Sequence, residues 1–217
     1  MNQRFVWGVV AALALGAAGC ASLPSQPTAA ELDAQALAML KASFRDEGIA
    51  TTKRLEQDLG QQACSAETAP PEGVAKRVED EALASIKWPT GGRYLGDWRE
   101  GEKLAQNGRG MTWTDKSAAP EANGANCYNC HQISKQEVSF GTIGPSLYNY
   151  GKIRGVQDPA DPASAAIVQY TWGKLWNSKA YNACSNMPRF GHAGLLNEEQ
   201  LRHVMALILD PRSPVNQ

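Results

Sequence analysis

Three residues within five positions, Cys127, Cys130 and His131 in the stretch CYNCH, have side chains that could do metal or redox chemistry. Two thiols three residues apart can both reach the edge of a flat macrocycle and add to its two vinyl groups. The histidine that follows them then lies under the ring, where its Nε2 can bind iron. The motif therefore predicts one covalently attached haem c, held by Cys127 and Cys130, with His131 as an axial ligand of the iron.

Two other cofactor assignments for this motif are weaker. A structural zinc site needs four ligands, and the sequence has no second Cys/His pair at short spacing. A redox-active dithiol is typical of a βαβ setting, and no alternating strand pattern is visible in this chain. Haem attachment is therefore the favoured interpretation.

A Gly-Pro segment follows the motif, at Gly144-Pro145-Ser146-Leu147. An iron-ligating histidine normally donates its other ring N–H to an acceptor that fixes the orientation of the ring. The segment resembles the Gly-Pro-x-Leu stretch of class I cytochromes c, in which the proline carbonyl is this acceptor. The resemblance implies that the carbonyl of Pro145 accepts a hydrogen bond from His131.

The sixth iron ligand must come from elsewhere in the chain, and the candidates are Met111, Met187, Met205, His192 and His203. Met205 lies on the apolar face of the last predicted helix, which indicates a core position, whereas His203 lies away from that face and is expected in solvent. Met187 precedes a proline and is therefore non-helical. The order of haem motif, Gly-Pro loop, Met-Pro loop and C-terminal helix is that of a class I cytochrome c. Met187 is favoured, with His192 and Met111 as alternatives, and a thioether ligand would raise the reduction potential.

Cys64 and Cys184 remain after the haem motif is assigned. Outside the cytoplasm such a leftover pair suggests a disulfide, here one that would connect an N-terminal helical region to the segment carrying Met187. Two separate thiols are the alternative interpretation.

The N-terminus has the pattern of an export signal. Arg4 precedes an apolar run over residues 5–18, which is shorter than the ~20 residues that span a bilayer. We therefore interpret residues 1–19 as a signal peptide and residues 20–28 as a linker of a periplasmic protein. The small residues before Cys20 resemble a lipobox, which predicts acylation of Cys20 and anchoring of the protein to a membrane as a lipoprotein. Ordinary signal-peptide cleavage nearby is the alternative.

Apolar periodicity and capping residues predict an all-α chain. Helices are expected over residues 29–47, 70–89, 97–107 and 163–172, and after the N-cap residue Asn197. Residues 29–90 would form a helical N-terminal extension that packs on a class I cytochrome c domain over residues 91–217. The 21 basic and 22 acidic residues nearly cancel, so no charge pattern for binding nucleic acid is present.

Several longer segments resemble one family: GGRYLGDWREGEKLAQNGRGM, SFGTIGPSLYNYGKIRG, YTWGKLWNSKAYNACSNMPRFGH and VMALILDPRSPVN. They are similar to SoxX, the monohaem cytochrome c subunit of the SoxAX complex. The similarity covers about residues 64–216, and its most specific block is NACSNMPRFGH.

The resemblance implies a role in an L-cysteine S-thiosulfotransferase. SoxAX joins thiosulfate oxidatively to a cysteine of the carrier SoxYZ, with the substrate chemistry on a SoxA-type dihaem or monohaem subunit. SoxX passes the electrons to a soluble cytochrome c, so this chain would carry no catalytic residue of its own. A stand-alone electron carrier tethered to the membrane is the alternative function.

Overall fold

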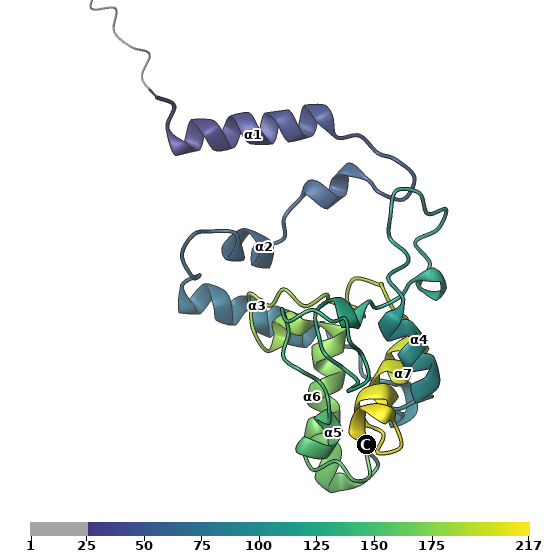
Figure 1. Ribbon diagram of the computed structural model, residues 1–217. Coiled ribbons are helices and arrows are strands. Elements are labelled where there is room, and N and C mark those ends of the chain that lie inside the picture. Colours follow the sequence, from purple (N-terminus) through teal and green to yellow (C-terminus); the bar gives the residue numbers. More distant parts are fainter. Residues whose placement is uncertain (1–25) are drawn as a thin grey trace, which may run out of the picture. The chain divides into compact units, whose positions relative to one another are not determined.

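The computed structural model describes residues 26–217 (Figure 1). The chain divides into two compact units, one ending at Phe44 and the other comprising Arg45–Gln217. The described residues contain no strand, only an isolated bridge between Glu47 and Ala50, which confirms the all-α class. The helices are α1 Ala29–Ser43, α2 Leu59–Cys64, α3 Glu72–Ala84, α4 Trp98–Gln106, α5 Tyr150–Ile153, α6 Ala165–Trp176 and α7 Glu198–Leu209.

Helix α1 begins where its capping residues predict and ends earlier than expected. Thr28 and Glu31 form a capping box at its first turn, which satisfies backbone N–H groups that lack helical partners. The helix stops at Ser43 rather than near residue 47, because Phe44 has an extended backbone conformation. Within its own unit, no residue of α1 is buried.

Helix α3 contributes to the hydrophobic core of the second unit. Val78 and Ala82 are buried on one face of α3, as the spacing of four residues predicts. The indole N–H groups of Trp172 and Trp176 on α6 donate to the carbonyls of Lys87 and Ser85, at 2.9 and 3.0 Å. Indoles that are buried or partly buried need such partners, so the segment after α3 supplies acceptors to the tryptophans in the C-terminal half of α6.

Helices α4 and α7 cross in close contact and lie side by side in Figure 1. The approach is close because Gly101 on α4 has no side chain: a Cβ there would lie 2.1 Å from the carbonyl oxygen of His203 on α7. The His203 side chain is not in solvent as predicted from the helical pattern. Its Nδ1 accepts a hydrogen bond from the backbone N–H of Asp97 at 2.9 Å, and 19% of the side chain is exposed. The expectation failed because the start of α4 covers this polar face of α7.

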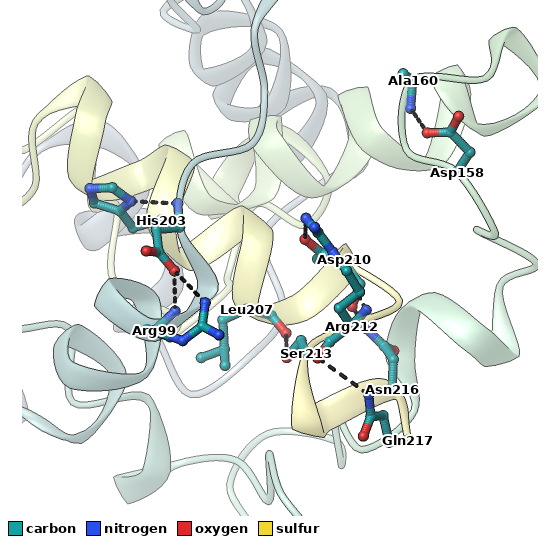
Figure 2. A network of polar contacts seen from close by, with 11 residues as sticks. Arg99, Asp158, Ala160, His203, Leu207, Asp210, Arg212, Ser213, Asn216 and Gln217 are labelled. Carbon is teal, nitrogen blue, oxygen red and sulfur yellow. Dashed lines mark hydrogen bonds and ion pairs between the residues drawn. The ribbon is translucent and has the colours of Figure 1, made fainter.

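The segment after α7 folds back along the helix (Figure 2). Ser213 donates through its hydroxyl to the carbonyl of Leu207 at 2.6 Å, which satisfies a carbonyl of the last helical turn. Asn216 is buried, and its Oδ1 accepts from the backbone N–H groups of Gly151 and Lys152 at the start of α5. The C-terminal segment therefore ties α7 to the region that follows Pro145.

Two glycine-to-alanine changes, one at the α4–α7 crossing and one away from it, should have opposite effects on the free energy of unfolding. Gly101→Ala should lower the free energy of unfolding by roughly 1–3 kcal/mol, because the added Cβ meets backbone and the helices must separate. Gly73→Ala in α3 is the matched control, since nothing lies within 4 Å of its added Cβ. It should raise stability by about 0.4–1 kcal/mol. Denaturant unfolding of the haem-loaded protein measures both, and equal stability of the two variants would mean that the crossing is not tightly packed.

Candidate functional site

A single 3-10 turn, Cys127–Asn129, positions the two thiols of the haem motif. Asn126 enters the turn with a left-handed backbone (φ 51°), and the carbonyl of Cys127 accepts from the N–H groups of Cys130 and His131 at 3.1 and 2.9 Å. Neither cysteine is in a disulfide. The turn is anchored to α4, because the hydroxyl of the buried Tyr128 donates to Glu102 at 2.9 Å.

The imidazole of His131 is held by the carbonyl oxygen of Pro145, which lies 2.6 Å from its Nδ1. A carbonyl oxygen can only accept, so Nδ1 must carry the proton, and Nε2 keeps the lone pair that binds a metal. Gly144 lies against the same ring: a Cβ there would come within 2.1 Å of Cε1 of His131. The Gly-Pro segment thus fixes both the tautomer and the position of the ring.

The loop between His131 and Pro145 is bonded back onto the motif. The N–H groups of Gly141 and Gly144 donate to the carbonyls of Tyr128 and Cys130, at 2.9 and 2.8 Å. A Cβ at Gly141 would lie 1.8 Å from the carbonyl oxygen of Asn129, so this close approach also requires glycine. Sequence reasoning identified Gly144 as part of the Gly-Pro segment but gave it no role, and it missed Gly141, although a glycine three residues before that segment is a signal that could have revealed it.

The donor set fits a haem better than zinc or a reactive dithiol. Burial raises the pKa of the Cys127 thiol to about 12, and the nearby Cys130 and Glu102 add to the rise. A redox-active cysteine needs the opposite, a thiolate stabilised at neutral pH. Within residues 26–217, no three His, Cys, Asp or Glu side chains converge on one point as metal ligands would. Two unpaired thiols beside a histidine with a free Nε2 are what haem attachment requires.

Met187 is partly buried and packs against the same hydrophobic cluster as Cys127. Its backbone is held on both sides. The carbonyl of Met187 accepts from the hydroxyl of Ser178 at 2.6 Å, and its N–H donates to the hydroxyl of Ser185 at 3.3 Å. The sequence pattern did not identify Ser178, because the contact joins a short 3-10 helix, Ser178–Ala180, to an irregular segment nine residues later.

The other candidate ligands have different surroundings. Met205 is fully buried in the core, as predicted from its place on the apolar face of α7. The Nδ1 of His203 is engaged by Asp97. His192 lines a cavity of about 180 Å³ between α2, α3 and the segment after α6, where burial lowers its pKa. Met111 has a left-handed backbone (φ 62°), and its carbonyl accepts from Arg54. Met187 stays our prediction for the sixth ligand.

Two long-range bonds connect the Met187 segment to α2. Cys64 and Cys184 form a disulfide across 120 residues, with their Cα atoms 5.4 Å apart. Arg189 forms an ion pair of 2.8 Å with Asp58, the N-cap residue of α2. These bonds bracket Met187 in the sequence and attach it to the region before the haem motif. Cys20 and the predicted signal peptide lie outside the described residues.

The fold and this donor set define a c-type cytochrome. Residues 99–210 match the cytochrome c family, and the chain belongs to that family. Over 165 residues it is 36% identical to an uncharacterized lipoprotein of Aquifex aeolicus (strain VF5), an alignment that covers 74% of this chain and 73% of that protein. Cytochrome c domains hold haem covalently and transfer electrons. From residue 26 onward, no helix has the length and apolar character needed to cross a membrane.

Replacement of Gly144 should displace His131. In Gly144→Ala the new methyl group would overlap the imidazole ring, so the ring must move and lose its bond to Pro145. We expect the reduced variant to bind carbon monoxide, whereas the wild type, with His131 and Met187 as the predicted iron ligands, should bind little. Ser146→Ala on the same loop is the control, because its exposed hydroxyl bonds only Gln132 and Tyr148. Equal carbon monoxide binding in all three proteins would contradict the positioning role.

Removal of the disulfide should destabilise the protein and loosen Met187. The double variant Cys64→Ser/Cys184→Ser should lose on the order of 4 kcal/mol of unfolding free energy, because the bridge closes a loop of about 120 residues. Denaturant unfolding measures the loss, and wild type treated with a reductant should approach the variant. In the variant, the far-red thioether-to-iron absorption band should disappear at a lower denaturant concentration than in wild type. This result would link the bridge to Met187. Identical unfolding curves would contradict this prediction.

Proposed function

We propose that this cytochrome c is the electron-transfer subunit of a SoxAX-type heterodimer. The observation that carries the proposal is the segment NACSNMPRFGH, the block most specific to the SoxX family. In this chain it contains Met187, the proposed iron ligand, together with Cys184 and Arg189, which attach the segment to α2 and its N-cap residue. A small electron carrier needs no such attachment to hold a methionine loop, so the arrangement favours a specialised subunit.

The described residues have roles that suit electron transfer without substrate binding. The bound haem supplies a one-electron Fe(III)/Fe(II) couple. Cys127 and Cys130 would hold it covalently, the carbonyl of Pro145 orients His131, and Ser178 and Ser185 position the backbone of Met187. With His131 and Met187 as its two protein ligands, the iron would offer no open site to thiosulfate or oxygen.

The substrate chemistry would therefore take place on the partner subunit. There, thiosulfate and a cysteine thiol of the SoxYZ carrier lose two electrons and one thiol proton as the new S–S bond forms. This chain would accept the electrons one at a time and pass each to a soluble cytochrome c.

A lipid anchor at Cys20 belongs to the same proposal. The small residues before Cys20 resemble a lipobox, with Ala17 where leucine is more usual, and the similar Aquifex aeolicus protein is named a lipoprotein. Acylation would hold the mature chain on the periplasmic side of a membrane. The same observation also favours the second candidate function, a stand-alone tethered electron carrier.

Purification from the native host tests the two functions. An affinity tag at the C-terminus should recover this chain together with a second c-type cytochrome, and the complex should reduce cytochrome c in the presence of thiosulfate and the SoxYZ carrier. Recovery of a monomer that neither binds a second cytochrome nor supports the reaction would contradict the heterodimer and favour the stand-alone carrier. Pyridine haemochrome spectra of the purified chain count its haems, and we expect one.

Met187→His tests the proposed sixth ligand. Because a thioether stabilises ferrous iron better than an imidazole does, the reduction potential should fall and the far-red thioether-to-iron band should vanish. Met111→His is the control and should leave both unchanged. An unchanged spectrum of Met187→His would exclude Met187 as the ligand.

A further inference from the structure

A polar cavity of about 370 Å³ lies beside Met187, between α2 and the segment 184–189. Its wall contains two cationic side chains, Lys179 and Arg189, and no aspartate or glutamate. The rest of the wall is rich in hydrogen-bonding groups, including Gln61, Ser65 and Asn186. A liquid water takes about 30 Å³, so the cavity has room for a small ion and several waters.

Lys179 is the unusual member of this wall, because its side chain is charged and only 8% of the residue is exposed. Within the described part of the chain, Nζ has one hydrogen-bond partner, the carbonyl of Ala183 at 2.9 Å. An ammonium group has three donors, and a buried charge without a counter-ion is costly. Burial lowers the pKa of Lys179, Asp58 opposes this effect and Arg189 adds to it.

Among residues 26–217, Arg189 also has N–H donors without a partner. Its Nη1 forms the ion pair with Asp58 at 2.8 Å, and the guanidinium has five N–H groups in total. The Asp58 carboxylate in turn accepts from the N–H of Gln61 at the start of α2. The single carboxylate of Asp58 therefore does not neutralise both Lys179 and Arg189.

We propose that this cavity binds a divalent oxoanion of the size of sulfate, held by Lys179 and Arg189. Such an anion would supply the missing charge and accept the remaining N–H donors, and the amides and hydroxyls of the wall would complete its hydrogen bonds. The site is separate from the haem motif, and its occupation does not depend on which partner the cytochrome serves.

Calorimetric titration of the haem-loaded full chain with sodium sulfate tests the proposal, with sodium chloride at equal ionic strength as the reference. We expect one saturable sulfate site in the wild type. Arg189→Gln should weaken sulfate binding roughly tenfold or more, since a hydrogen bond to a charged group is lost. Lys179 is unsuitable for the first variant because its amine also holds the Ala183 carbonyl.

Asp58→Asn is the matched control. It breaks the same ion pair as Arg189→Gln but removes a negative charge instead of a positive one, and an asparagine still caps α2. Sulfate should therefore bind to this variant as tightly as to the wild type or more tightly. The proposal would be overturned if the wild type had no saturable sulfate site or bound chloride as strongly as sulfate. It would also be overturned if both variants weakened sulfate binding to the same extent.

Discussion

The contact between Nδ1 of His131 and the carbonyl oxygen of Pro145 is the constraint on which the site depends. It turns a histidine that could exist as either tautomer into one whose Nε2 is free to bind iron. The contact requires Gly144, because any Cβ there would overlap the ring. The contact also requires that the backbone after Pro145 be held in place. The N–H of Leu147 donates to the carbonyl of Gln132, and Asn216 holds the start of α5, so the C-terminal segment ultimately helps to orient the proposed ligand.

The segment with Met187 is held by bonds of a different kind. On the His131 side, backbone bonds within about fifteen residues are sufficient, and glycines permit the close approach. The Met187 segment has no regular structure, and its support comes from Ser178, the Cys64–Cys184 disulfide and the Asp58–Arg189 ion pair. A partly exposed ion pair contributes little stability by itself. The covalent bridge must therefore carry most of the restraint, so α2 is part of the support of the Met187 segment.

The parts of this protein that were predictable from sequence depend on local chemistry. Capping boxes at Thr28 and Asn197 marked helix starts, and the haem motif, the Gly-Pro segment and the remaining cysteine pair are short patterns with a stated physical reason. The unpredicted features depend on contacts between distant residues. Examples are the Asp97–His203 bond across the α4–α7 crossing and the ion pair of Asp58 with Arg189, 131 positions apart in sequence numbering. Helix α5 was missed because four residues carry too little periodicity.

The placement of the cysteines limits the chemistry that this chain can perform. Of its five cysteines, Cys127 and Cys130 lie in the haem motif, Cys64 and Cys184 are bonded to each other, and Cys20 lies in the predicted lipobox. The described residues therefore hold no additional thiol that could carry a sulfur substrate or serve as a thiolate ligand to a second metal. The oxidative step proposed above joins thiosulfate to a cysteine thiol of the carrier protein, and neither of the reacting sulfur atoms belongs to this chain. In that proposal this chain contributes only the removal of electrons.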